Sequence, residues 1–235
     1  MEEQQKSSNS VQWIAIAIIV AALIISGAVL YTNPKSNTGN NTGNNNTGTQ
    51  PVVVDASKVK TAGVPFVGNA NAKVIIAYWS DYQCPFCKRF DEDAIKNAYN
   101  EYVVTGKAKI VFKDYSFLGA DSITAGLAAR AVWELYPDKF YQWHVAMFTK
   151  QDNENAGWGK KADILALISS LGMDASKVDQ LMTSKAAEYQ KAMDADKAEG
   201  TAFGINGTPG TIVGKQMISG AQPYATLKAA IDAVK

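Results

Sequence analysis

The stretch that decides the fold is residues 73–90, which read KVIIAYWSDYQCPFCKRF. Residues 73–79 form a short apolar run rich in β-favouring side chains, which predicts a buried strand. After Pro85 the apolar residues recur at helical spacing, so this strand leads directly into a helix. Both cysteines of the chain, Cys84 and Cys87, lie at the junction. We therefore expect the chemistry of the protein there.

Further strands and helices follow on the C-terminal side of this junction. They are a strand at 108–114, several helices within 121–150 and 161–200, a hairpin at 210–219 and a last helix that begins at Pro223. Strand, helix and strand imply a right-handed parallel crossover. The prediction is an α/β frame, β-α-β followed by β-β-α, interrupted by a helical subdomain.

The first fifty residues have a different composition from the rest. We divide the chain into a short tail (1–10), an apolar anchor (11–31), an Asn/Thr/Gly-rich linker (32–51) and a folded domain (52–235). The anchor carries no charge, and about 21 helical residues reach about 30 Å, the thickness of a bilayer core. The linker lacks the apolar residues that would offset the entropy of ordering, so it is predicted to be a disordered tether.

Two questions about this N-terminal part stay open in the sequence. A cleaved signal peptide is the alternative to an anchor, although the apolar run is longer than usual and the tail is not basic. Asn40 and Asn45 begin N-x-T sequons, which an Asn/Thr tract also produces by chance.

The net charge of the whole chain, +1, gives no sign of a nucleic-acid partner.

The position of the two cysteines predicts unequal chemistry. Cys84 falls at the helix N-cap and Pro85 at the first helical position, where the missing proline N–H is not needed. Free N–H groups and the positive end of the helix dipole then stabilise a thiolate, so the pKa of Cys84 should be lowered. Cys87 lies one turn further, more shielded but close enough to form a disulfide with Cys84. Cys84 is predicted to attack and Cys87 to resolve.

Other uses of two cysteines fit the sequence less well. A closed zinc site needs four ligands, and the chain has two cysteines and one histidine, His144. Haem attachment needs C-x-x-C-H, whereas Lys88 follows Cys87. Copper(I) held by two thiolates remains an alternative. We expect no metal and no organic cofactor, only a redox-active Cys84–Cys87 disulfide.

The segments DYQCPFCKRF and GINGTPGTIVGKQMISGAQP resemble the DsbA-type thiol–disulfide oxidoreductases of the thioredoxin superfamily, over about residues 60–235. The resemblance implies a thioredoxin fold with a helical insertion, here at about 117–200. It also implies that Cys84 is the exposed nucleophile and Cys87 the resolving cysteine. A cis-proline loop faces the disulfide in this family, which assigns Pro209 as the cis-proline and Thr208 as a residue that contacts substrate and tunes the redox potential.

The sequence departs from the family pattern near the cysteines. Several members carry an acidic residue six positions before the first cysteine, where this chain has Tyr78. Asp81 is the nearest carboxylate in sequence, and either accepts the Cys87 proton or, as its position favours, caps the turn. Phe86 replaces the histidine of the most oxidising members, which leaves the direction of the reaction open.

His144 and the aromatic residues of 133–148 have two interpretations each. His144 titrates near neutral pH when unperturbed, yet a histidine satisfied by packing is the simpler interpretation. The aromatics either line a peptide groove or form the helical core, and their spacing favours the core.

Together these features predict a membrane-anchored, extracytoplasmic thiol–disulfide oxidoreductase that acts on protein substrates as a dithiol oxidase. A membrane redox partner would recycle its disulfide. The alternatives are a reductase or isomerase on the same scaffold, and a thiol-based copper-binding module.

Overall fold

The computed structural model describes residues 54–154 and 156–234. The predicted anchor, the linker and the sequons at Asn40 and Asn45 lie outside these residues. Among the helices of the described ranges, none is both long and apolar enough to span a bilayer.

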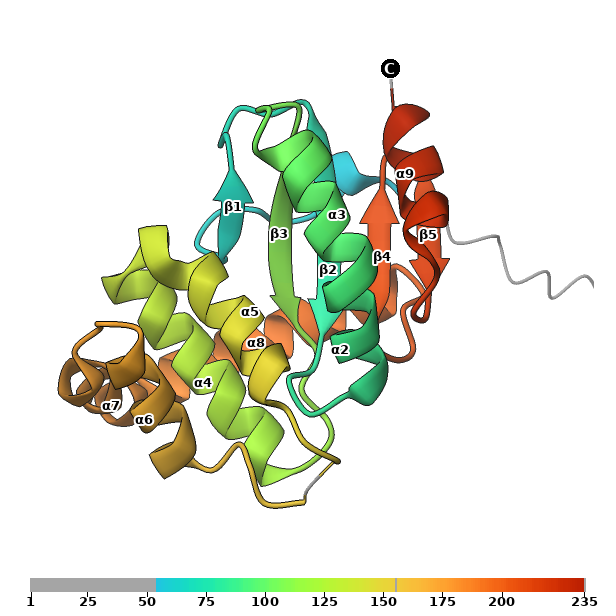
Figure 1. Ribbon diagram of the computed structural model, residues 1–235. Coiled ribbons are helices and arrows are strands. Elements are labelled where there is room, and N and C mark those ends of the chain that lie inside the picture. Colours follow the sequence, from blue (N-terminus) through green and yellow to red (C-terminus); the bar gives the residue numbers. More distant parts are fainter. Residues whose placement is uncertain (1–53, 155, 235) are drawn as a thin grey trace, which may run out of the picture. The chain divides into compact units, whose positions relative to one another are not determined.

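A five-stranded mixed sheet is the centre of the fold (Figure 1). Its strands are β1 (Phe66–Gly68), β2 (Val74–Ser80), β3 (Ala108–Asp114), β4 (Gly210–Val213) and β5 (Gln216–Ser219), in the order β1-β3-β2-β4-β5. The central strands β2 and β3 are parallel, with Val74 opposite Ala108 and Ser80 opposite Asp114. The remaining neighbours are antiparallel. The predicted strand–helix–strand crossover and the C-terminal hairpin are therefore confirmed.

One long helical segment joins β2 to β3. It consists of α2 (Pro85–Phe90), η2 (Asp91–Ile95), α3 (Lys96–Ala98) and η3 (Tyr99–Val103), of which η2 and η3 are π-helical. The C-terminal helix α9 (Tyr224–Asp232) packs beside this segment. Pro223 is the N-cap of α9, rather than its first residue as predicted. These helices cover one face of the sheet.

The predicted helical insertion is confirmed between β3 and β4. It contains α4 (Ala120–Leu135), α5 (Phe140–Lys150), α6 (Lys161–Ser170), α7 (Ala175–Ser184) and α8 (Ala186–Ala202), and a 3₁₀ turn, η4 (Pro137–Lys139), separates α4 from α5. Figure 1 shows these helices gathered at the end of the sheet toward which β2 and β3 run. The insertion thus lies beside the start of α2, where the cysteines are.

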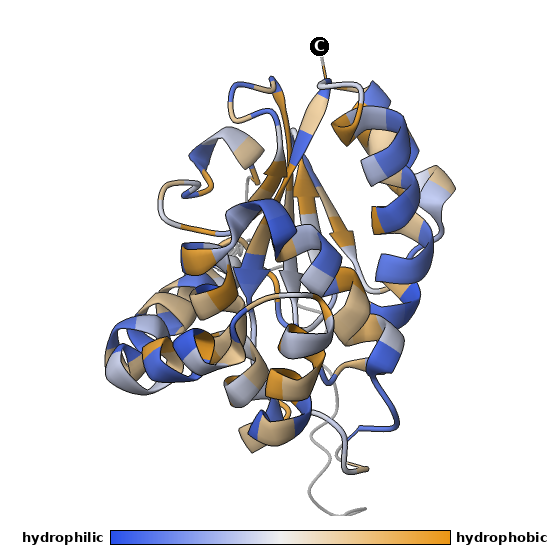
Figure 2. Ribbon diagram, turned by 60° about the vertical axis from the view of Figure 1, so that its left-hand side comes forward, coloured by the Kyte–Doolittle hydropathy of each residue, from blue (hydrophilic) through white to orange (hydrophobic). Residues whose placement is uncertain are grey.

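The alternation of side chains along β2 divides the core in two. Ile76 and Tyr78 point into the larger cluster, which includes the helices after β2 and most of the insertion. Ala77 and Trp79 point to the other face, into a smaller cluster with the 3₁₀ turn η1 (Ala56–Lys58). All four side chains are fully buried, so β2 is a central strand covered on both faces. In Figure 2 the central strands are largely orange, whereas the surrounding helices also carry blue, hydrophilic residues.

The edge strand β1 was not predicted. It has three residues, and it pairs with β3 through Phe66 opposite Val111. Gly68, with φ 105°, ends it in a backbone conformation that side chains disfavour. A strand of three residues is too short to show a periodic pattern in the sequence. It forms because β3, which comes later in the chain, offers it an edge to pair with.

Candidate active site

The junction after β2 places Cys84 at the N-cap of α2. Its backbone is extended, with φ −79° and ψ 117°, and Pro85 occupies the first helical position as predicted. The Cys84 carbonyl accepts the N–H groups of Cys87 (3.0 Å) and Lys88 (3.2 Å), which closes the first turn of the helix. The Cys84 sulfur therefore lies over the free N–H groups of a helix start.

The pKa of the Cys84 thiol is lowered to about 6. The largest cause is the hydrogen bond from the Cys87 thiol, and Thr208 and the backbone N–H groups of Cys87 and Phe86 add to it, while burial opposes them. Sequence reasoning predicted the direction of this shift and the contribution of the N–H groups. It missed that the second cysteine is the main source of stabilisation.

Cys87 has the opposite environment. Its side chain is 0% exposed and its pKa is raised well above the ordinary value, first by burial and then by its proximity to Cys84. Both cysteines are thiols in this structure. At neutral pH the pair is therefore one thiolate beside one thiol.

The expectation that Cys84 is exposed is wrong for this reduced state, because its side chain is only 4% exposed. The loop before β4 lies against it, and the Cys84 thiol is 3.5 Å from the Thr208 carbonyl oxygen that accepts its hydrogen bond. This loop therefore covers part of the approach to the Cys84 sulfur.

The Thr208–Pro209 peptide bond is cis, as the resemblance implied. The Pro209 carbonyl accepts the N–H of Gly220 (2.9 Å), which fastens the loop to the end of β5. The Thr208 hydroxyl oxygen is buried, and this side chain is one of the groups that lower the pKa of Cys84. This loop thus brings the backbone carbonyl and the hydroxyl of Thr208 close to the cysteines.

Asp81 caps the turn that precedes Cys84. Its Oδ1 accepts hydrogen bonds from the Gln83 N–H (2.8 Å) and the Ser122 hydroxyl (2.7 Å). Its Oδ2 accepts from the N–H groups of Phe117 (2.9 Å) and Leu118 (3.2 Å). Four donors surround the carboxylate, which supports the turn-capping interpretation and ties the turn to the start of the insertion.

Tyr78 stands where several family members have an acid. It is fully buried, its hydroxyl lies 3.5 Å from the Cys87 carbonyl oxygen, and burial raises its pKa well above the ordinary value. The side chain is therefore an uncharged phenol. Position 78 therefore supplies no carboxylate that could take up the Cys87 proton.

Exposed aromatic surface lies next to the cysteines. Phe86, within the CPFC motif, is 53% exposed, and the Arg89 guanidinium lies 5.1 Å from its ring centroid. Phe117 is also exposed, and its N–H binds Asp81 of the turn. An exposed apolar rim of this kind is typical of a surface that binds peptides.

Sequence reasoning missed the contacts that α5 makes with the turn. The Gln151 side-chain amide donates to the carbonyls of Tyr82 (2.6 Å) and Cys84 (3.2 Å). His144 bonds to the Tyr82 hydroxyl (2.8 Å) and to Asp91 (2.7 Å), which confirms it as a satisfied, buried histidine. These residues are 50 to 70 positions apart in sequence, so no local pattern could bring them together.

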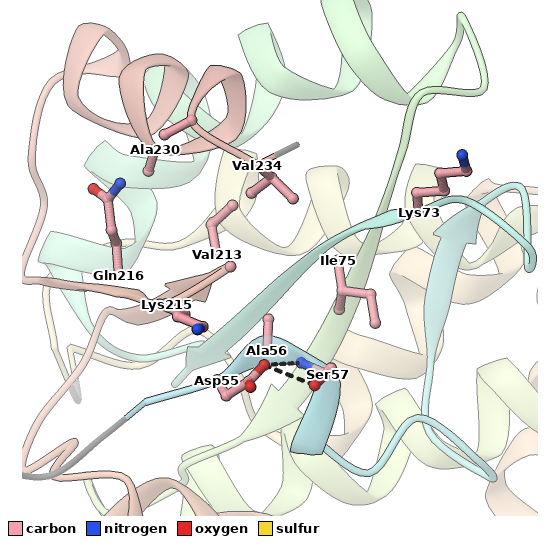
Figure 3. A pocket seen from close by; sticks show the side chains of 12 residues that line it. Asp55, Ala56, Ser57, Lys73, Ile75, Val213, Lys215, Gln216, Ala230 and Val234 are labelled. Carbon is pink, nitrogen blue, oxygen red and sulfur yellow. Dashed lines mark hydrogen bonds between the residues drawn. The ribbon is translucent and has the colours of Figure 1, made fainter.

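A separate hollow of about 370 Å³ lies at the other end of the sheet (Figure 3). Ile75 at the start of β2, Val213 at the end of β4 and Val234 after α9 line it. Asp55 on its wall is bonded to the N–H and hydroxyl of Ser57. Since Cys84 follows the opposite end of β2, this hollow is not part of the redox site.

A family model described as thioredoxin matches residues 60–233. The chain therefore belongs to this thioredoxin family, and with its CPFC motif it is a thiol–disulfide oxidoreductase of the DsbA type. "Probable disulfide bond formation protein D" of Bacillus anthracis is 24% identical over 231 residues, 97% of each chain. "Disulfide bond formation protein D" of Bacillus subtilis is 27% identical over 173 residues, 72% of this chain and 76% of that one.

Solved structures agree with the fold. The oxidised form of BdbD from Bacillus subtilis covers 77% of this chain and 96% of its own, with a TM-score of 0.69 and 24% identity. The thiol–disulfide exchange protein alpha-DsbA2 from Wolbachia pipientis covers 74% and 88%, with a TM-score of 0.64 and 26% identity.

Proposed function

We propose that the protein is an extracytoplasmic dithiol oxidase that donates the Cys84–Cys87 disulfide to protein substrates. The observation that carries this proposal is the lowered pKa of Cys84, about 6, next to the raised pKa of Cys87. A thiol of low pKa is a good leaving group, so exchange favours release of the Cys84 thiolate over its retention in a disulfide. No metal or organic cofactor enters this reaction.

The proposed reaction has two exchange steps. A substrate thiolate attacks the Cys84 sulfur of the oxidised pair, and the S–S bond breaks with its electron pair going to Cys87. Because burial raises the pKa of Cys87, this sulfur takes up a proton. A second substrate thiolate attacks the substrate sulfur of the mixed disulfide, and Cys84 leaves as a stabilised thiolate. The substrate is oxidised by two electrons and the enzyme is reduced.

Substrate binding is proposed at the surface around the cysteines. The exposed rings of Phe86 and Phe117 offer apolar contact to an unfolded segment. The Thr208–Pro209 loop precedes β4, where an extended peptide can pair with backbone groups beside Cys84. Together they would bind an extended segment with a cysteine over Cys84 and apolar residues beside it.

The setting proposed for this reaction follows from the N-terminal sequence. The apolar run 11–31 would anchor the chain in the membrane, and the linker 32–51 would let the domain move over a span on the order of 25 Å. A domain that forms disulfides belongs on the extracytoplasmic side. Each turnover leaves a dithiol, so a membrane redox partner that removes two electrons is required.

The proposal is tested with the oxidised full-length chain and a reduced peptide that carries two cysteines. An oxidase converts the peptide to its disulfide with one equivalent of enzyme, and Cys84→Ala abolishes the conversion. A reductase would leave the peptide reduced and would instead consume peptide disulfide when supplied as the dithiol. A copper carrier would do neither at a useful rate and would bind Cu(I) through both thiolates.

A further inference from the structure

Helix α5 contacts the redox turn, residues 81–87, at its backbone. Gln151 follows the end of α5 and is 5% exposed. Its side-chain amide donates to the carbonyl oxygens of Tyr82 (2.6 Å) and Cys84 (3.2 Å), and its own carbonyl accepts the Lys88 ammonium (2.8 Å). One residue of the insertion thus holds the chain on both sides of the helix start.

A second contact from α5 runs through His144, which is 0% exposed. A carboxylate can only accept, so the His144 Nε2–H donates to Asp91 (2.7 Å). In the neutral ring this leaves Nδ1 to accept the Tyr82 hydroxyl proton, with Nδ1 and the oxygen 2.8 Å apart. Asp91 is in η2, four residues after Cys87. His144 therefore links Tyr82, which lies two residues before Cys84, to the helix that follows the cysteines.

We propose that Gln151 and His144 are positioning residues that keep the Cys84 sulfur in contact with the donors that stabilise its thiolate. The inference rests on the proposed role of Cys84 as the reactive sulfur. It assigns to the insertion a task within the exchange reaction, in addition to covering the end of the sheet.

The geometry gives the physical reason. The direction of the Cys84 carbonyl is set by ψ of Cys84, and the same rotation sets where the next N–H groups lie relative to the sulfur. Gln151 fixes this carbonyl from outside the helix, together with the N–H groups of Cys87 and Lys88 from inside it. Since the N–H groups of Phe86 and Cys87 help to lower the pKa of Cys84, a turn released from α5 holds them less well.

The side-chain oxygen of Gln151 helps to distinguish a positioning role from a packing role. Its Oε1 is buried, and no hydrogen-bond partner for it exists in the described part of the chain. A buried amide with an unpaired oxygen is unfavourable for stability, so an apolar side chain of similar length would be tolerated there on stability grounds alone. The positioning role explains why an amide serves better at this point.

The test uses the full-length chain in detergent with three variants. Q151M keeps the volume and removes both donors. H144F removes the link between Tyr82 and Asp91, whereas H144Q retains an amide that can accept from one and donate to the other. The matched control is W143F, because Trp143 is buried beside the Tyr82 ring, with centroids 5.3 Å apart, and its indole N–H has no partner in the described ranges.

Two properties are measured on each folded variant: the thiolate absorbance of Cys84 against pH, and the reduction potential. In Q151M and H144F the pKa of Cys84 is expected to rise by about one unit, a tenfold weaker stabilisation of the thiolate, and the potential to become less oxidising. H144Q should stay near the wild type. W143F should lose thermal stability while its Cys84 pKa stays unchanged.

An unchanged pKa in folded Q151M and H144F would overturn the proposal, and so would an equal rise in W143F. If H144F does not fold, Y82F removes only the hydroxyl that His144 accepts and replaces it in the comparison. Because the pKa comparison does not depend on the direction of exchange, a wild-type chain that proves to be a reductase would refute the oxidase proposal and leave this one standing.

Discussion

The redox turn and a second buried polar cluster differ in how their buried charges are stabilised. The first keeps a reactive thiolate, whereas the second pairs every charge with an opposite one. We call the second cluster the ionic network; it consists of Lys113, Asp114, Arg130, Asp196 and Glu199. There each charge meets an opposite charge: Arg130 binds Asp114 and Asp196, and Lys113 binds Asp196 and Glu199. In the redox turn, the largest stabilising contributions to the Cys84 thiolate come from neutral donors.

The difference between the two clusters lies in what their charges can still do. The Arg130 guanidinium neutralises the carboxylates of Asp114 and Asp196 and so holds β3, α4 and α8 together. The charge of these carboxylates is used in the ion pairs. A thiolate held by a thiol, a hydroxyl and N–H groups keeps its charge available for exchange. The following predictions test this contrast, from the largest expected effect to the smallest.

Replacing Cys84 by Ser should abolish disulfide exchange with protein thiols, because the hydroxyl has no thiolate chemistry near neutral pH. Cys87→Ser should instead leave Cys84 able to attack, and it should trap covalent adducts with disulfide-containing substrates since the resolving thiol is absent. Non-reducing electrophoresis after mixing with a substrate distinguishes them. An adduct in the Cys84→Ser variant would contradict the assigned roles.

Replacing Arg130 by Met should destabilise the fold by about 3–5 kcal/mol, because the buried Asp114 carboxylate loses its ion-pair partner and Asp196 keeps only Lys113. The free energy of unfolding, measured by urea titration, checks this loss of stability. The pKa of Cys84 should not change in this variant. Lys161→Met is the matched control, since the Lys161–Asp179 pair is exposed and should contribute little. A Cys84 pKa that follows the Arg130 substitution would show that the two clusters are not independent.

The two substitutions of Cys87 should differ in their effect on the pKa of Cys84. Cys87→Ala removes the hydrogen bond that is the largest cause of the lowered pKa, so a rise of about one unit is expected. Cys87→Ser keeps a donor at this position and should raise it less. Alkylation rates of Cys84 against pH give both values, and equal values in the two variants would refute the donor role of Cys87.

Stability should depend on pH in the reduced protein. The folded pKa of Cys84 is about 6, below that of a thiol in the unfolded chain, about 8.5. Between these values the unfolded state binds one more proton, so stability of the reduced form rises with pH from about 6 to 8.5 and is lost as pH falls through 6. The oxidised form has no such group. Urea midpoints of both forms across this range should therefore diverge as pH rises, and parallel curves would contradict the thiolate assignment.

The parts of the molecule that sequence predicted are those with a local signal. Apolar runs mark β2 and β3, and a proline after a cysteine marks the start of α2. The cis peptide bond at Pro209 was found through the resemblance, since the local sequence fits a trans turn equally well. The helical insertion followed from the length of chain between the two halves of the frame.

The parts that sequence did not predict depend on long-range contacts. The strand β1 exists because β3 offers it an edge, and Gln151 reaches Tyr82 across 69 positions of the chain. The low exposure of Cys84 and the main cause of its pKa shift arise from the approach of Thr208 and Cys87. Such properties depend on distances in the folded state, which residue types alone do not encode.

The most direct test of the central claim is the reduction potential of the Cys84–Cys87 pair, measured in the full-length chain equilibrated with glutathione buffers. If the Cys84 thiolate is stabilised as the structure indicates, the dithiol form is favoured and the disulfide is a strong oxidant. The account predicts a potential of about −120 to −150 mV. A value of about −230 mV or lower would contradict it and identify the protein as a reductase.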